Sequence, residues 1–389
     1  MAIQRQTKTL LLILAFGVFG ILNTEMGVIG ILPQVAEVFH ISITESGLLI
    51  SGFALGVALA GPVLPLLLSR YNRKHIMLLV VSVFFLCTAV TPWIDNFYIV
   101  LVLRILPALL HPVFCSLAFS IAAGAVDSEE SPKAVAYITV GVSAGMVLGV
   151  PISNFLATQI SLESAYYFFA AINAIAVLLI ALKVPSMAVT APLSYGSQLK
   201  ILAKPVLWIS IVGAICMNGA IYGVFGYAAE YISIVIQVSP LVGSVLLFIY
   251  GVMNIVGSLW AGHLLVKRSK QTVWILPIAV GSIYIGMYVS TTSVWLSAMC
   301  IVMWGIAAGI NANVTQYWVY TSAPEAPDFV NGLFLTAVNL GTTLASLGCG
   351  YVIAILELPW VVAGGVIMSI LSLAAIAWRY SIDNAVRCI

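Results

Sequence analysis

The stretch YYFFAAINAIAVLLIAL, residues 166–182, holds 17 residues without one charged side chain. A transmembrane helix needs about 20 mostly apolar residues, whereas a transmembrane β-strand needs about 10 residues that alternate between apolar and polar. This run is long and does not alternate, and similar runs occupy Ile76–Val90 and Val361–Trp378. The sequence therefore predicts an all-α membrane protein built from membrane-spanning helices.

The composition of the whole chain agrees with that interpretation. Of its 389 residues, 62% are hydrophobic and 7% are charged, whereas a soluble domain carries about 25% charged residues. This excludes a cytosolic enzyme, a disordered protein, a nucleic-acid binder and a secreted disulfide scaffold. The six cysteines occur singly, without the paired spacing of a disulfide framework or a metal site: Cys87, Cys115, Cys216, Cys300, Cys349 and Cys388.

Polar breaks divide the chain into twelve expected spans. The longest break, Pro185–Lys204, is rich in Pro, Ser and Gly, which is typical of a linker. We therefore expect an N-terminal six-helix bundle over 1–184, a linker over 185–204 and a C-terminal six-helix bundle over 205–389. The spans are expected near residues 9–37, 43–69, 75–93, 97–125, 133–158, 163–183, 205–230, 240–266, 272–290, 293–320, 329–355 and 359–379.

Lysine and arginine indicate the orientation. Arg104 falls inside the fourth expected span, and the other fourteen basic residues all lie in segments on one side of the membrane. Because cytoplasmic loops carry the excess of Lys and Arg, both termini are expected in the cytoplasm. The cluster Arg70–Lys74 after the second span has a counterpart, Lys267–Lys270, after the eighth. Basic clusters in matching loops suggest two related halves with a binding site between them.

Several motifs resemble those of the major facilitator superfamily, in its drug:proton antiporter branch with twelve spans. Asn23-Thr24-Glu25, followed by Gly30-Ile-Leu-Pro33, is similar to the first-helix signature of sugar-efflux and purine-efflux permeases. Arg104 with Ala108 and His111 is similar to the fourth-helix arginine motif. The fifth-helix antiporter motif is matched by a run of four residues: Gly141, Gly145, Gly149 and Pro151.

The resemblance implies two pseudo-symmetric six-helix bundles and proton-coupled efflux. The chain also departs from the family pattern at two places. Pro65 and Ser69 stand where the basic loop motif normally has Gly and Asp, which removes the usual acidic gating contact. Ser153 and Asn154 replace the paired glycines that normally end the fifth-helix motif, which predicts looser packing or additional polar contacts to substrate.

Glu25 and Arg104 are the strongest candidates for chemistry. A carboxylate within a span is costly and normally faces a cavity or a partner. Both residues are expected at similar depth, so they could pair when the site is empty, with the alternative that they form a permanent structural ion pair. His111 lies seven residues after Arg104 and could shuttle protons, or could simply pack. Glu230, near the outer end of the seventh span, is a second candidate for proton coupling or a headgroup-level carboxylate.

Polar and aromatic side chains within the spans are candidates for binding a substrate, or for bonding neighbouring helices. They are Asn23, Asn218, Tyr222, Tyr227, Asn311, Gln316 and Asn339. Gating is expected in two regions. Gly141, Gly145 and Gly149 recur every four residues, which predicts a close helix–helix seam ahead of a distortion at Pro151. Arg70, Arg73 and Lys74 form either a cytoplasmic ionic latch or a determinant of topology alone.

These features predict a proton-driven efflux permease of the bacterial inner membrane, working as a monomer, without a cofactor and on a small organic molecule. No G-x-x-x-x-G-K-[ST] motif is present, so an ATP-driven pump is not expected from this chain alone. Two alternatives remain: a symporter or facilitator that imports a nutrient, and a membrane receptor or scaffold that does not transport. Lipophilic drugs, sugars and nucleosides are all compatible with the sequence.

Overall fold

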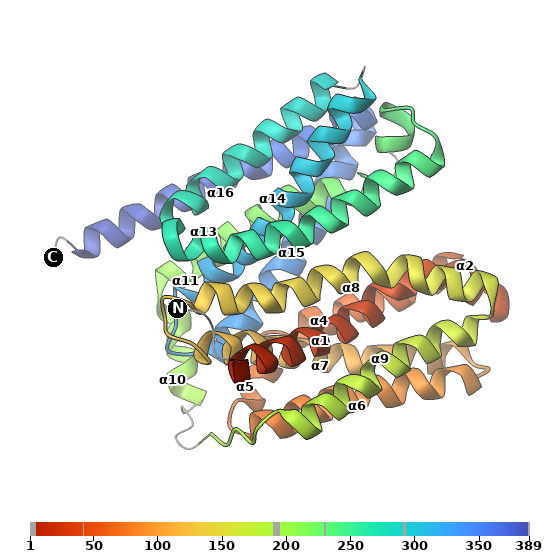
Figure 1. The fold of residues 1–389 in the computed structure, drawn as a ribbon. Coiled ribbons are helices and arrows are strands. Elements are labelled where there is room, and N and C mark those ends of the chain that lie inside the picture. Colours follow the sequence, from red (N-terminus) through yellow and green to blue (C-terminus); the bar gives the residue numbers. More distant parts are fainter. Residues whose placement is uncertain (1–4, 42, 190–194, 229–230, 291–292, 388–389) are drawn as a thin grey trace. The chain divides into compact units, whose positions relative to one another are not determined.

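The computed structural model describes residues 5–41, 43–189, 195–228, 231–290 and 293–387, and within these residues the chain is helical without β-strands (Figure 1). Ten helical segments are long and apolar enough to cross a membrane, and the shorter apolar helix Leu48–Ala60 supplies an eleventh. The helix Pro240–Val289 has non-helical dihedrals at Arg268 (φ −147°, ψ 46°), which divide it into two arms. The described residues therefore contain the twelve spans that the sequence predicts.

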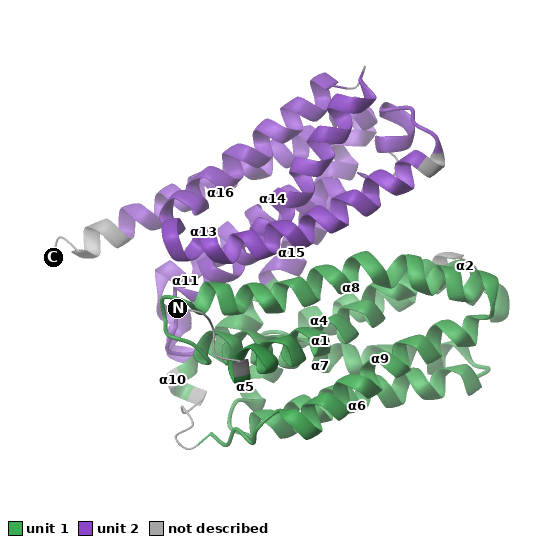
Figure 2. Cartoon of the chain, viewed as in Figure 1, with its two compact units in different colours: residues 1–198, 327–336 green, residues 199–326, 337–389 purple. Residues whose placement is uncertain are grey.

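The chain forms two compact units (Figure 2). Unit 1 contains residues 1–198 and 327–336, and unit 2 contains residues 199–326 and 337–389. The division at residue 198 falls within the expected linker 185–204. Residues 327–336 are the first part of the eleventh span, so this helix contributes its beginning to unit 1 and the rest to unit 2.

Most of the helices of unit 1 begin or end at residues whose side chains or rings favour a terminus. Asn72, Asn96 and Ser161 each accept a hydrogen bond from a backbone N–H in the first turn of the helix that follows them. The elements are α1 (Arg5–Gly27), η1 (Val28–Ile31), α2 (Leu32–Val38), α3 (Ile43–Ser46), α4 (Leu48–Ala60), α5 (Leu64–Leu68), α6 (Arg73–Val90), η2 (Thr91–Trp93), α7 (Phe97–Gly124), α8 (Ser131–Gln159), α9 (Leu162–Lys183) and α10 (Tyr195–Leu199).

The first two expected spans are interrupted rather than continuous. The predicted span 9–37 ends as an α-helix at Gly27, passes through η1, and resumes as α2 with Pro33 in its first turn. The predicted span 43–69 breaks between α4 and α5, next to Pro62 and Pro65. Proline lacks a backbone N–H and its ring clashes with the preceding turn, which accounts for both interruptions, while the expected bounds of the first span agree with the membrane-spanning segment Gln6–Val38.

Unit 2 contains η3 (Lys200–Ala203), α11 (Pro205–Phe225), η4 (Tyr231–Val235), α13 (Pro240–Val289), α14 (Val294–Tyr320), α15 (Pro327–Leu356, from Ala337 onward), η6 (Leu358–Trp360) and α16 (Val361–Arg387). Its core includes an aromatic cluster. Trp304 of α14 lies 4.9 Å from Tyr250 and 5.8 Å from Tyr284, between ring centroids, and Phe225 stacks on Tyr250 at 4.7 Å. These rings join α11, both arms of α13, and α14.

Glycines allow close backbone approach in both units. A Cβ added at Gly141 of α8 would lie 2.2 Å from the Ala15 carbonyl oxygen of α1, and one at Gly145 would lie 2.6 Å from Leu22 Cβ. In unit 2, a Cβ at Gly309 of α14 would meet the carbonyl oxygen of Asn254 on α13. Helices can approach this closely only where a side chain is missing. The predicted seam of the fifth span therefore packs against the first span, and α8 continues through Pro151 to Gln159.

Candidate functional site

Arg104 of α7 lies in unit 1 against the C-terminal end of α1. Its guanidinium donates to the carbonyl oxygens of Thr24 at 2.9 Å and Glu25 at 2.7 Å, and to that of Leu49 at 3.4 Å. The last four carbonyls of a helix lack partners within it, and positive charge is favourable at that end. Because α1 ends at Gly27, Arg104 caps this helix and also stacks on Phe53 at 4.4 Å.

Ser153 and Asn154 of α8 complete the capping of the same segment. Ser153 Oγ donates to the Gly27 carbonyl oxygen at 2.6 Å, and Asn154 Nδ2 donates to that of Gly30 at 2.8 Å. The sequence predicted that these departures from paired glycines give either looser packing or additional polar contacts to substrate. Their hydrogen bonds instead satisfy main-chain oxygens where the helix is interrupted, so polar side chains here compensate for the break between α1 and α2.

The carboxylate of Glu25 faces His111. Its Oε2 atom lies 3.8 Å from His111 Nε2, and the Glu25 and His111 side chains are 14% and 5% exposed. Neither His111 ring nitrogen nor Glu25 Oε2 has a hydrogen-bond partner among the described residues. The expected pairing of Glu25 with Arg104 has a different geometry. Arg104 donates to the main-chain carbonyl oxygen of Glu25, while the Glu25 carboxylate faces His111, which lies two helical turns further along α7.

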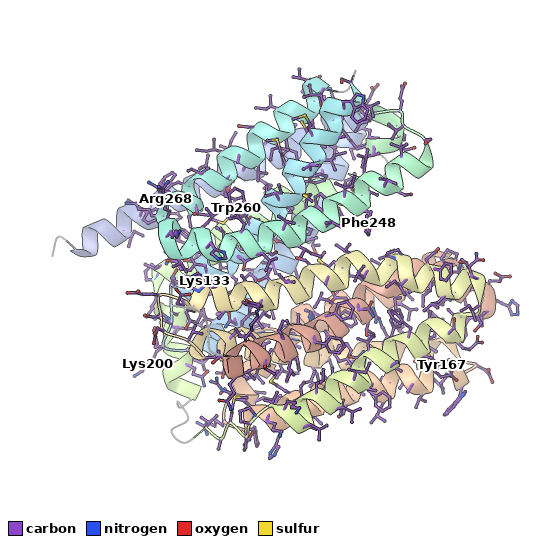
Figure 3. The ribbon with its side chains drawn as sticks, in the orientation of Figure 1. Lys133, Tyr167, Lys200, Phe248, Trp260 and Arg268 are labelled. Carbon is purple, nitrogen blue, oxygen red and sulfur yellow. The ribbon has the colours of Figure 1, made fainter. Side chains whose placement is uncertain are left out.

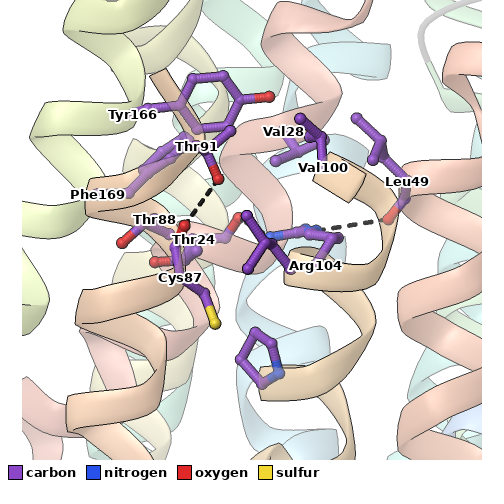
Figure 4. A pocket seen from close by; sticks show the side chains of 12 residues that line it. Thr24, Val28, Leu49, Cys87, Thr88, Thr91, Val100, Arg104, Tyr166 and Phe169 are labelled. Carbon is purple, nitrogen blue, oxygen red and sulfur yellow. Dashed lines mark hydrogen bonds between the residues drawn. The ribbon is translucent and has the colours of Figure 1, made fainter. Parts of the chain in front are cut away.

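A small cavity lies next to Arg104 (Figure 4). Its volume is about 20 Å³, which is enough for one water molecule. Thr24, Thr88 and Thr91 line it together with Tyr166, whose hydroxyl is buried and has no partner among the described residues. Each threonine hydroxyl donates to the carbonyl oxygen four residues earlier. Asn173 donates to Thr24 Oγ1 at 2.8 Å and fixes this wall. Near the C-terminal end of α1, unit 1 therefore holds a buried acid, a histidine and a fixed cation, and the cavity beside Arg104 has space for one water molecule.

Arg104→Lys is expected to destabilise the protein despite conserving the charge. Lysine lacks the planar fork that reaches three carbonyl oxygens at once. Leaving a buried acceptor unpaired costs about 1–3 kcal/mol, so thermal unfolding in detergent should begin at a clearly lower temperature. The matched control is Arg70→Lys, since Arg70 is exposed in the loop between α5 and α6. Equal unfolding temperatures for wild type and Arg104→Lys would show that the capping bonds contribute little.

The structure separates the three cations of the proposed latch. Lys74 Nζ donates to the Ala181 carbonyl oxygen at 2.8 Å and so caps α9, while Arg70 is exposed. Arg73 pairs with Asp328 at 3.3 Å, within unit 1. Ser116 Oγ donates to the Asp328 carbonyl oxygen, which holds the start of α15 against α7. Arg73 therefore has an acidic partner on another span.

The candidates on α11 and just after it contact neighbouring helices. Asn218 Nδ2 donates to the Val338 carbonyl oxygen at 2.7 Å and to Thr342 Oγ1 at 2.9 Å. The Tyr227 hydroxyl donates to the Ser346 carbonyl oxygen at 3.1 Å. Both residues therefore bind α11 and the segment after it to α15. Tyr222 packs edge-on against Phe225, with ring centroids 6.2 Å apart, and joins the aromatic cluster of unit 2.

The remaining polar candidates differ in burial and in whether their side chains have hydrogen-bond partners. Asn311 is 2% exposed and its Nδ2 has no partner among the described residues. Gln316 is buried with its polar group engaged, and Asn339 is half-buried. Asn23 is fully buried beside Gly145 and Gly149, and its side-chain amide has no partner among the described residues. Glu230 lies outside the described residues.

Sequence reasoning missed two groups of residues. Asp328 is the acid that Arg73 contacts. The sequence feature that could have indicated it is an acidic residue just after Pro327, where the eleventh span begins on the basic side of the membrane. Thr24, Tyr166 and Asn173 form the wall beside Arg104, and uncharged residues of this kind are common within spans. Among the described residues, no three His, Cys, Asp or Glu side chains are grouped as metal ligands.

Comparisons with known proteins agree with this architecture. The model of the Major Facilitator Superfamily matches residues 14–346. The chain is 26% identical over 344 residues to the inner membrane transport protein YdhP of Escherichia coli strain K12, covering 88% of each chain. It is 24% identical over 356 residues to a probable sugar efflux transporter of Helicobacter pylori strain G27, covering 92% of this chain and 90% of that one.

Solved structures share the fold at low sequence identity. The human organic anion transporter MFSD10 superimposes with a TM-score of 0.78 at 15% identity, covering 97% of this chain and 100% of that one. The E. coli fucose:proton symporter FucP gives a TM-score of 0.77 at 14% identity, covering 96% and 98%. With a family model matched over most of its length and the same helical architecture, the chain belongs to the Major Facilitator Superfamily and is a transporter rather than an enzyme.

Proposed function

We propose that this transporter exports a small organic molecule in exchange for protons. The proposal is carried by the Glu25 carboxylate, which lies 3.8 Å from His111 with an unpartnered oxygen. An ionisable group at membrane depth is costly and most often has a functional role. The Helicobacter relative named a probable sugar efflux transporter supports export, as does the likeness of Gly141–Pro151 to the antiporter motif of the fifth helix.

In the proposed cycle, one carboxylate responds to both ligands. A proton from outside neutralises Glu25, and a substrate from the cytoplasm favours release of that proton. A ligand shifts a conformational equilibrium only by its differential affinity for the two states, so the coupling group must sense both proton and substrate. Arginine keeps its proton in such a setting. Arg104 therefore contributes a fixed positive charge and a fixed end of α1, while His111 is the nearest group able to share a proton with Glu25.

The hydrogen bonds between helices reduce the number of candidates for substrate contact. Asn218 and Tyr227 are engaged in bonds between helices, so we retain Asn23, Tyr222 and Asn311, with Gln316 and Asn339 as secondary candidates. The name of the Helicobacter relative makes a sugar the first substrate to test. A lipophilic molecule is also compatible with the sequence, so a test must include both classes.

We also propose a monomer in the bacterial inner membrane with both termini in the cytoplasm. The Escherichia coli relative is named an inner membrane transport protein, which supports this membrane, and the distribution of Lys and Arg supports the orientation. Reporter fusions at each terminus test the orientation directly. A periplasmic reporter signal from either end would contradict it.

Reconstituted vesicles with an internal pH dye test the function. The substrate panel is a pentose, a purine, a lipophilic cation and a neutral antibiotic, each applied with and without an imposed pH gradient. Antiport predicts that one class of substrate moves against the direction of proton flow. Substrate flux without proton movement would identify the protein as a facilitator. Substrate flux in the same direction as the protons would identify it as a symporter. A complete lack of flux across the panel would favour a receptor or scaffold.

Arg73 and Asp328 are proposed to act as the gate on the cytoplasmic side. Asp328 belongs to the part of α15 that lies in unit 1, and α15 continues into unit 2 from Ala337, so this ion pair bears on a helix shared by both units. Asp328→Asn removes the charge but keeps the side-chain volume. A hydrogen bond between charged groups contributes about 1.5–3 kcal/mol, so opening of this region should become at least ~10-fold more frequent.

Hydrogen exchange of residues 327–336 measures that opening. The matched control is Glu325→Gln, which also removes an acid but breaks the pair with Lys204 in unit 2. We expect faster exchange in residues 327–336 and in the loop before α6 for Asp328→Asn alone. Equal acceleration in both variants, or no change in Asp328→Asn, would contradict a specific latch.

A further inference from the structure

A groove in unit 2 has the character of a binding site for one lipid chain. It lies between the two arms of α13 and α14, and its volume is about 430 Å³, which is within the range of small-molecule sites. Its walls are mostly apolar and include Trp260, Ile275 and Met303, whose side chains are half-exposed or more. Both α13 arms and α14 are spans, so the groove runs along helices that cross the membrane.

Polar groups gather where the two arms of α13 meet. Arg268, Gln271 and Thr272 belong to the groove lining, and Arg268 is the residue at which the helix breaks (Figure 3). Thr272 Oγ1 donates to the Arg268 carbonyl oxygen at 2.9 Å and so holds this bend. The Arg268 side chain is exposed, and its guanidinium has no hydrogen bond or ion pair with the described residues. The groove therefore has an apolar length and, at one end, a cation that has no partner among the described residues.

The charge of this region lacks an acidic counterpart in the surrounding sequence. Lys267, Arg268 and Lys270 fall within a stretch, residues 231–324, that contains no Asp or Glu. Lys270 points elsewhere, since its Nζ lies 5.1 Å from the centroid of the Tyr380 ring. An anionic group would therefore complement Arg268, which has no acidic partner among the described residues. Basic pockets between spans on the cytoplasmic side are known to suit phospholipid headgroups.

We propose that this groove binds an anionic phospholipid, with an acyl chain between α13 and α14 and the phosphate at Arg268. Trp260, Ile275 and Met303 supply the apolar contact, while Gln271 is placed to donate to the phosphate or glycerol oxygens. A guanidinium suits this role, because its planar set of donors matches phosphate geometry. The site lies wholly within unit 2 and does not depend on proton coupling or on the direction of transport.

Lipid retention by the full-length protein tests the assignment. Wild type and variants are purified, exposed to equal mixtures of phosphatidylglycerol and phosphatidylcholine, and examined by native mass spectrometry. Arg268→Gln should lower phosphatidylglycerol retention by roughly 5–30-fold, since a basic residue and its bonds to phosphate contribute on this scale, and should leave phosphatidylcholine unchanged. Lys270→Gln is the matched control, because it removes the same charge from the same turn without lining the groove. Equal losses in both variants would overturn the site.

A second measurement reports the acyl chain rather than the charge. Phosphatidylglycerol with brominated chains quenches nearby tryptophan, and Trp260 lies in the groove wall. Quenching should decrease in Trp260→Phe and in Arg268→Gln, and should persist in Lys270→Gln. Ala279→Phe fills the groove while keeping every charge, so it should also lower retention. Equal quenching by brominated phosphatidylcholine, or displacement of the lipid by a transported substrate, would overturn the proposal.

Discussion

Glu25→Gln is expected to abolish substrate-driven proton movement while leaving the protein folded. Glutamine has nearly the same shape as glutamate, so the packing of α1 against α7 and α8 should persist. The amide cannot bind and release a proton, and the 3.8 Å approach to His111 loses its acidic member. Arg104 holds the main chain of Glu25 rather than its carboxylate, so the capping bonds at 2.9 and 2.7 Å remain available to the variant.

Substrate affinity as a function of pH is the most direct measurement. Coupling between two ligands typically amounts to about 1–3 kcal/mol, which is a ~5–150-fold change in affinity. Wild type should show a change of this size as Glu25 titrates, and Glu25→Gln should bind substrate with the same affinity across the range. Glu37→Gln is the control, because Glu37 on α2 is an exposed carboxylate of the same unit.

Survival of pH-dependent affinity in Glu25→Gln would transfer the coupling role to another group. His111 is the first alternative within unit 1, and His111→Gln in the Glu25→Gln background would then test it. If both variants retain proton movement, Glu230 is the remaining candidate from the sequence. A Glu25→Gln protein that no longer folds would instead indicate that the ionised carboxylate is structural.

The positions of the spans could be predicted closely, because every segment that crosses the hydrocarbon core of a membrane must be a long and mostly apolar helix. The fourth span was expected over 97–125 and is α7, Phe97–Gly124; the eleventh was expected over 329–355 and is α15, Pro327–Leu356. The expected depth of Glu25 and Arg104 was also sufficient to bring them together. Interruptions near Pro33 and Pro62 were less predictable, because proline is tolerated within spans when neighbouring groups satisfy the freed carbonyls.

The partners of polar side chains could not be predicted from the same information. Hydrophobicity fixes how deep a residue lies, but it does not fix which neighbour its side chain meets. Asn218 is a predicted substrate contact, and its amide bonds α15; Arg104 is a predicted partner of the Glu25 carboxylate, and its guanidinium caps α1. Main-chain carbonyl oxygens at a helix break also accept hydrogen bonds from polar side chains, as those of Thr24 and Gly27 do. The sequence does not show which carbonyl oxygens need such a donor.

Gly141→Ala is expected to destabilise unit 1 markedly, although it adds one methyl group. The new Cβ would lie 2.2 Å from the Ala15 carbonyl oxygen and 2.9 Å from the Ala15 carbonyl carbon, so α8 must move away from α1. Overpacking of this kind costs about 1–3 kcal/mol, and Gly141→Ala combined with Gly145→Ala should cost more because both press on one helix. Thermal unfolding in detergent and the yield of folded protein measure the loss.

Gly348→Ala provides the matched control, since nothing lies within 4 Å of a Cβ at this position on α15. Alanine within a helix is favoured over glycine by about 0.5–1 kcal/mol, so this variant should be as stable as wild type or more so. The pair also separates packing from gating. If the seam served gating alone, Gly141→Ala would unfold at the wild-type temperature and fail only in transport. Because α1 carries Glu25 and α8 carries the Ser153 and Asn154 caps, we expect loss of transport to follow loss of this contact rather than to occur without it.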